Sequence, residues 1–288
     1  MHLEIPHRIA IERHGAGKPL LLIMGIGGQL TQWPEEFVRG LIAAGFDTIA
    51  MDNRDIGLSA KFIDGGMPQS RRMIARYMLG LPVNAPYTLR DMAEDAAKVL
   101  AALEIDRAQV VGISMGSMIA QILAAEHPHL VERLTLFHTN LGLRRDLPAP
   151  KAIAALTGKP VSSRTAYEER FLHLFKTIGS PKLGRSDEEL REYAARAYAR
   201  NYHAPGFRRQ MAAILATGNR TSYCRAIDCP TTIIHGRVDP LMPLKGARRV
   251  AKQIRNSRLC VFDELGHDLP EALLSDFISL IAEGSIDP

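Results

Sequence analysis

Cysteine, aromatic residues and long apolar runs are all scarce in this chain. Its 288 residues include three cysteines, Cys224, Cys229 and Cys260, an odd number too small for a disulfide framework. Cys224 and Cys229 are separated by four residues, and no third or fourth zinc ligand lies near them in the sequence. We therefore expect reduced thiols, no metal and no metal cofactor.

The scarcity of long apolar runs bears on whether the chain could cross a membrane. No stretch approaches the 18 uninterrupted apolar residues that a transmembrane helix needs. The N-terminal stretch MHLEIPHRIAIERHG is polar and charged where a signal peptide has its apolar core. We therefore expect a cytoplasmic protein with no membrane partner.

Aromatic residues make up 6% of the chain and the formal net charge is +5. The excess of positive charge lies between residues 141 and 228, which hold 16 Lys and Arg against 8 Asp and Glu. The basic pairs are not interleaved with aromatics as in a single-strand-binding groove, so we expect no nucleic-acid partner. A solvated basic helical surface is favoured over a surface that steers anionic ligands.

Short apolar segments alternate with amphipathic ones along most of the chain. Continuous apolar runs predict buried strands at 19–25, 47–52, 108–114, 131–138, 231–236 and 258–266, and an alternating pattern predicts an outer strand at 8–13. Helices are predicted at 34–45, 88–105, 116–128 and 270–284. Alternation of strand and helix is typical of an α/β fold with parallel strands.

One region contains helical patterns only. Between residues 141 and 228 the sequence predicts helices at 186–202 and 207–220 and no strand, and Ser186 with Glu189 forms a capping-box pattern. We therefore expect an α/β core over 1–140 and 229–288, with a helical cap inserted over 141–228.

The segment Gly112-Ile-Ser114-Met-Gly116 lies between a predicted strand and a predicted helix. It matches the pattern Gly-x-Ser-x-Gly of a nucleophile elbow, in which glycines allow a sharp turn that exposes the serine hydroxyl. The alternative interpretation is that Ser114 is an ordinary helix N-cap.

A nucleophilic serine hydroxyl needs an adjacent base that is oriented by an acid. In folds with a nucleophile elbow, the acid and then the histidine follow later strands of the sheet. Asp239 and His267 follow two successive predicted strands, whereas Asp263 and Asp268 are too close to His267 in sequence to orient its ring. The other candidate histidines are interpreted as packing or solvated residues (His127, His129, His138, His173 and His203) or, for His235, as a supporting residue at most.

A developing oxyanion needs two backbone N–H donors. The pattern assigns one to Met115, after the serine, and one to Ile26 in the glycine-rich stretch MGIGG. That stretch lacks the Gly-x-Gly-x-x-Gly spacing of a dinucleotide site, so we expect no cofactor. Trp33, the only tryptophan, follows this loop and either lines a pocket or packs in the core.

Together, MGIGG (24–28), DNRDIGLS (52–59), GISMG (112–116), DP (239–240) and GH (266–267) resemble the motifs of the α/β-hydrolase superfamily. Within that superfamily, the chain resembles the serine esterases of the aclacinomycin (anthracycline) methylesterase type. The resemblance implies an eight-stranded, mostly parallel sheet with a helical cap and no cofactor. It implies Ser114 as nucleophile, Asp239 as acid, His267 as base, and Ile26 and Met115 as oxyanion donors.

Two departures and several alternatives remain. Met24-Gly25 stands where many relatives have His-Gly, and Arg54-Asp55 stands in place of Arg-Gly; we interpret Asp52, Arg54 and Asp55 as a structural brace. The expected function is hydrolysis of a small-molecule carboxylic ester. A lactonase, an amidase, a carbon–carbon bond hydrolase and a slow-turnover ligand receptor are alternatives, because one fold and one triad serve them all. The sequence leaves the natural substrate, the cap residues that line the pocket and the oligomeric state open.

Overall fold

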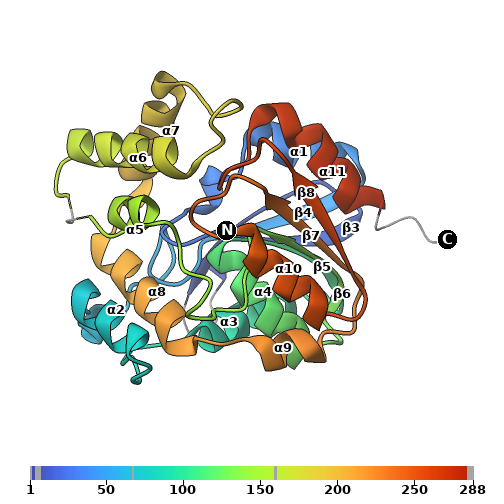
Figure 1. Ribbon diagram of the computed structural model, residues 1–288. Helices are drawn as coiled ribbons and strands as arrows, with labels where there is room; N and C mark the ends of the chain where they lie inside the picture. The colour runs from blue at the N-terminus through green and yellow to red at the C-terminus, as the bar shows by residue number, and fades with distance from the viewer. Residues whose placement is uncertain (1, 4–7, 67, 159–160, 284–288) are drawn as a thin grey trace.

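Eight strands form one sheet in the order β1-β2-β4-β3-β5-β6-β7-β8 in the computed structural model, which describes residues 2–3, 8–66, 68–158 and 161–283 (Figure 1). The strands are β1 (His2–Leu3), β2 (Ile9–His14), β3 (Lys18–Ile23), β4 (Phe46–Met51), β5 (Ala108–Ile113), β6 (Val131–Phe137), β7 (Thr231–Gly236) and β8 (Ser257–Phe262). The pairs β1–β2 and β2–β4 are antiparallel and all other pairs are parallel. Because β1 is two residues long, seven strands carry nearly all of the sheet, and the predicted mostly parallel architecture is confirmed.

Helices connect the strands and cover both faces of the sheet (Figure 1). They are α1 (Glu35–Ala43), α2 (Ser70–Met78), α3 (Leu89–Ala102), α4 (Met115–Glu126), α5 (Pro150–Leu156), α6 (Arg164–Ile178), α7 (Asp187–Asn201), α8 (Ala204–Thr217), α9 (Thr221–Ala226), α10 (Leu244–Gln253) and α11 (Leu274–Glu283), with short 3-10 helices at Leu30–Gln32, Ile63–Gly65 and Glu271–Leu273. The predicted capping box of Ser186 and Glu189 is confirmed at the start of α7, where each side chain accepts the other's backbone N–H. Within the described ranges, no helix has the length and apolar character needed to cross a membrane.

The sheet buries a separate apolar layer on each face. In β3, Leu21 and Ile23 pack toward α3 and α4, whereas Leu20 and Leu22 pack toward α1 and α11. Successive side chains of a strand point to opposite faces, so a strand covered on both sides has to be apolar at every position. This explains why the central strands read as continuous apolar runs.

Some boundaries differ from the sequence predictions. The strand predicted at 258–266 ends at Phe262, and the chain then turns into a loop that carries His267. The helix predicted at 270–284 begins as a 3-10 turn before α11, and its predicted end at residue 284 lies outside the described residues. The strand β1, which is two residues long, and the helices α2 and α10 were not predicted.

The segment between β6 and β7 holds α5 to α9 and no strand among its described residues. In Figure 1, α5, α6 and α7 extend to one side of the sheet. The last helix, α9, instead packs against α4 and α10, and its Cys224 is buried in the core layer below the sheet. The part of this segment that leaves the sheet layers therefore includes α5 to α7, whereas α8 packs against α2 and α3.

Candidate active site

Ser114 occupies a strained turn between β5 and α4. Its φ of 57° and ψ of −119° lie where few residues other than glycine are found. The flanking glycines make the turn feasible: a Cβ on Gly116 would collide with the carbonyl oxygen of Ile23, and one on Gly112 would collide with that of Gly116. Ser114 holds the N-cap position of α4, but its side chain makes no capping hydrogen bond. The hydroxyl is therefore directed elsewhere.

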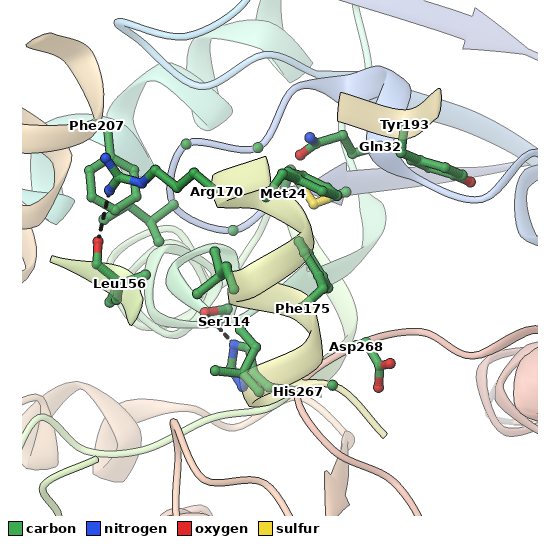
Figure 2. A pocket seen from close by; sticks show the side chains of 18 of the residues that line it. Met24, Gln32, Ser114, Leu156, Arg170, Phe175, Tyr193, Phe207, His267 and Asp268 are labelled. Atoms are coloured by element: carbon green, nitrogen blue, oxygen red, sulfur yellow. Dashed lines mark hydrogen bonds between the residues drawn. The ribbon is translucent and has the colours of Figure 1, made fainter. Parts of the chain in front are cut away.

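The Ser114 hydroxyl faces His267, and His267 faces Asp239. Ser114 Oγ lies 3.0 Å from His267 Nε2, and His267 Nδ1 lies 2.7 Å from Asp239 Oδ2. Because a carboxylate only accepts, Nδ1 carries the proton and Nε2 is free to accept the hydroxyl hydrogen. Figure 2 shows the Ser114 and His267 side chains directed toward one another. The structure thus brings together three side chains that the sequence places up to 153 positions apart.

Asp239 is an ionised, fully satisfied carboxylate. Its Oδ1 accepts hydrogen bonds of 2.8 Å from the backbone N–H groups of Leu241 and Met242. Burial by itself would raise the pKa of Asp239, but the adjacent rings of His267 and His138 outweigh it and hold that pKa far below its usual range. The acid can therefore orient and stabilise a protonated His267 without taking its proton.

Two further histidines surround Asp239. His235, on β7, places Nε2 at 2.7 Å from the carbonyl of Met242, and its Nδ1 accepts the N–H of Thr139. Burial lowers the pKa of His235 to about 4, so this ring is neutral. It supports the loop after β7, as the sequence suggested.

His138 is the residue that sequence reasoning missed. It directly follows β6, it is fully buried, and its Nδ1 lies 3.2 Å from Asp239 Oδ2. Its position at the carboxyl end of a strand adjacent to β7 was a usable signal, because the ends of neighbouring parallel strands meet at one edge. The prediction that it is only a packing or solvated residue is incomplete, because it also contacts the acid.

The predicted oxyanion donors flank Ser114. Met115 is the first residue of α4, and Ile26 belongs to the loop 24–28, which lies so close that a Cβ on Gly25 would be 3.2 Å from the Ser114 Cβ. Neighbouring amides are occupied: the N–H of Gly27 donates to Gln210 Oε1 and that of Gly28 to the Gly25 carbonyl. Within the part of the chain that the structure describes, the N–H groups of Ile26 and Met115 have no hydrogen-bond partner. Both amides are thus available to a ligand.

A cavity of about 420 Å³ opens onto Ser114 and His267. Its floor includes the loop 24–28, and much of its wall comes from α6, α7 and α8 (Figure 2). The wall is aromatic and basic, with the side chains of Tyr167, Phe171, Phe175, Tyr193, Tyr202, Phe207, Arg170, Lys176, Arg185 and Arg208. Asp268, an acid in the wall, accepts hydrogen bonds from the N–H and hydroxyl of Ser180 and so braces the loop.

Trp33 does not line this cavity. Its indole is buried in the layer beneath α1 and stacks on Phe37 with ring centroids 5.7 Å apart. The pocket role considered for Trp33 is therefore wrong, and the packing alternative holds. Its neighbours Gln32 and Pro34 do line the cavity.

The segment after β4 forms the expected brace. Arg54 binds Asp95 of α3, Asp55 binds Arg209 of α8, and the carboxylate of Asp52 binds Arg200 of α7. None of these three residues of the segment lies in the cavity wall. Asp52 and Asp55 thereby join α7 and α8, two helices of the wall, to the core.

Among the described residues, two groups of side chains have the composition of a metal site. The buried one is His138, Asp239 and His267, and the other is Glu94, Glu126 and His127, whose residues are absent from the cavity wall. Two ligands of a tetrahedral zinc ion lie about 3.3 Å apart, given bonds of about 2.0–2.1 Å. The 2.7 Å between His267 and Asp239 is shorter and fits a hydrogen bond.

Comparison with known proteins finds relatives that match most of the chain. The family model described as alpha/beta hydrolase fold matches residues 18–271. The chain is 31% identical over 285 residues to a rhodomycin D methylesterase from Streptomyces peucetius, covering 90% of this chain and 87% of that protein. It is 28% identical to a 2-hydroxymuconate semialdehyde hydrolase from Pseudomonas sp. strain CF600, covering 96% and 89%.

Solved structures share the fold. The crystal structure of the enol-lactonase from Burkholderia xenovorans LB400 superimposes over 100% of both chains with a TM-score of 0.75 at 17% sequence identity. Identity at this level shows the fold alone. Taken with the family match over residues 18–271, these findings show that the chain belongs to the α/β hydrolase family.

Proposed function

We propose that this protein is a serine hydrolase that cleaves a small-molecule carboxylic ester. The observation that carries the proposal is the hydrogen-bonded series Ser114, His267 and Asp239 at the wall of a cavity large enough for a small ligand. The similarity to a methylesterase of related sequence supports ester over other acyl substrates.

In the first half-reaction His267 acts as a general base. Nε2 takes the hydroxyl proton of Ser114 as Oγ attacks the ester carbonyl, and Asp239 stabilises the imidazolium that forms. The N–H groups of Ile26 and Met115 donate to the carbonyl oxygen as it becomes an oxyanion. His267 then protonates the departing alcohol, which leaves Ser114 acylated.

In the second half-reaction water takes the place of the alcohol. His267 removes a proton from the water as it attacks the acyl carbonyl, and the same two amides stabilise the second oxyanion. His267 returns its proton to Ser114 Oγ, and the carboxylic acid leaves. The backbone strain at Ser114 keeps the hydroxyl outside the helix throughout.

The segment 141–228 serves as the cap of a core made of 1–140 and 229–288. Support comes from the cavity wall, to which α6, α7 and α8 contribute most of the aromatic side chains. Replacing Phe175 by alanine enlarges the cavity beside Ser114 and should raise KM for small esters more than it lowers kcat. A lower kcat with an unchanged KM would contradict this role.

Hydrolysis of a carbon–carbon bond is a second candidate. The similarity to a 2-hydroxymuconate semialdehyde hydrolase favours it over the lactonase, amidase and receptor alternatives. Parallel assays with p-nitrophenyl esters, a lactone, an anilide and a vinylogous β-diketone rank these reactions by kcat/KM. Tight binding with near-zero turnover of every compound would favour the receptor.

The proposal is tested with Ser114→Ala. We expect ester turnover to fall to background while far-UV circular dichroism stays unchanged, because the buried hydroxyl makes no capping bond. Ser222→Ala is the matched control, since Ser222 is an exposed serine on α9. Ester turnover that persists in Ser114→Ala would refute the assignment.

A further inference from the structure

His138 is a buried ring whose two nitrogens both face oxygen atoms. Nε2 lies 3.0 Å from the backbone carbonyl of Asp268, and Nδ1 lies 3.2 Å from Asp239 Oδ2. The residue adopts a left-handed φ of 48°, a region in which asparagine, aspartate and histidine are the most frequent residues after glycine. This fully buried histidine, in contact with the acid, has no part in the reaction as described above.

The contacts of His138 determine its protons. A carbonyl oxygen can only accept, so Nε2 must carry a hydrogen to make the 3.0 Å contact with Asp268. If the ring were neutral, Nδ1 would be a lone pair turned toward the lone pairs of Asp239 Oδ2. That arrangement is repulsive, and burial would strengthen the repulsion.

His235 provides the internal comparison. Its Nε2 also faces a carbonyl, but its Nδ1 faces the N–H of Thr139, a donor. One proton satisfies both nitrogens of His235, which fits a neutral ring. His138 has an acceptor on each side and needs two protons.

We infer that His138 is a doubly protonated positioning residue that keeps Asp239 ionised and opposes protonation of His267; this inference rests on the proposed function. Oδ2 of Asp239 already accepts from His267, so a proton on that oxygen would compete with this bond, and a proton on Oδ1 would compete with the N–H groups of Leu241 and Met242. The Nδ1–H of His138 is too poorly aligned for a hydrogen bond but attracts the carboxylate as a charge. Removing it would leave Asp239 with only neutral donors around it.

The charge acts on the base because the rings are close. The ring centroids of His138 and His267 are 4.8 Å apart, and that of neutral His235 is 5.7 Å from His138. Asp239 is the acid that contacts His138, since Asp268 contributes only its carbonyl while its carboxylate binds Ser180. A positive charge here makes a second positive charge on His267 less favourable, so His267 stays an active base to lower pH.

The test is the pH dependence of fluorophosphonate labelling at Ser114 in wild type and in His138→Asn. Asparagine tolerates a positive φ and keeps an N–H donor near Asp239, but it carries no charge. In His138→Asn we expect the acid limb of the pH–rate profile for labelling to move to higher pH. A unit charge at 4.8 Å shifts it by about 0.6 pH units at an effective dielectric constant of about 80 and by about 2.5 pH units at about 20. The rate at the alkaline plateau should change little.

Each outcome separates the two proposals. No labelling of wild-type Ser114 at any pH would overturn the proposed function itself. Labelling with identical acid limbs, or a rate lowered equally at every pH in His138→Asn, would overturn the role of His138. If His138→Asn does not fold, nitrogen-15 NMR of the wild-type histidine rings decides: two protonated nitrogens on His138 support the inference, and one refutes it.

Discussion

Replacement of Arg209 by methionine should destabilise the protein strongly. The guanidinium donates from Nε and Nη2 to the two oxygens of Asp55 at 2.8 Å each, and it donates from Nη1 to the carbonyl of Gly66. Both side chains of the pair are almost completely buried, at 3% and 0% exposure. Removing the cation leaves the Asp55 carboxylate buried with only the Tyr87 hydroxyl and the N–H of Phe62 as donors.

The expected loss is about 3–5 kcal/mol of unfolding free energy, the usual cost of leaving one charge of a buried pair alone. Burial by itself would raise the pKa of Asp55, and the hydrogen bonds from Arg209, Tyr87 and Phe62 lower it. Its folded pKa is therefore below the unfolded one, so the pair stabilises the protein at neutral pH and this contribution is lost as pH falls through that folded pKa. Arg209→Met should accordingly show a smaller loss of stability in acid than at neutral pH.

Urea unfolding followed by fluorescence measures this loss, because Trp33 is the only tryptophan and is buried. The matched control is Arg39→Met, which breaks only exposed pairs with Glu35 and Glu36 and should cost no more than about 0.5 kcal/mol. The double variant with Asp55→Asn should recover part of the loss, since no charge is then unpaired. A loss below about 1 kcal/mol for Arg209→Met would refute the view that this pair ties α8 to the core.

Three further results are expected. Gly116→Ala should lose about 1–3 kcal/mol or more and become unreactive, because its Cβ would displace the carbonyl of Ile23; thermal unfolding and labelling together check this. Asp239→Asn should lower kcat about 10⁴-fold with the fold retained, because the wrong His267 tautomer is then favoured. Steady-state kinetics and circular dichroism measure the two, and a fall in kcat of less than about tenfold would contradict the role of Asp239. Trp33→Phe should leave KM unchanged and cost only about 1 kcal/mol, because the indole N–H has no partner and the ring lies outside the cavity; a changed KM would contradict that placement.

The sheet and the turn at Ser114 could be predicted because their signals are local. A strand covered on both faces must be apolar throughout, and a strained turn between strand and helix requires glycines at 112 and 116. Asp239 and His267 could be assigned to the same edge as Ser114 because each follows a predicted parallel strand, a pattern only a few positions long.

The remaining features depend on how distant segments meet. Trp33 lies inward against Phe37, and nothing in the neighbouring sequence distinguishes this position from one in the cavity wall. His138 has significance only through Asp239 and the Asp268 carbonyl, which come from two other loops. The aromatic cavity wall is likewise assembled from three helices, whose packing no single-residue pattern determines.

Mapping the site of fluorophosphonate attachment by mass spectrometry tests the central claim most directly, because it needs no knowledge of the substrate. The account predicts a single adduct on Ser114 that is absent in Ser114→Ala and forms far more slowly in His267→Ala. An adduct on another serine, or no adduct on a correctly folded protein, would contradict it.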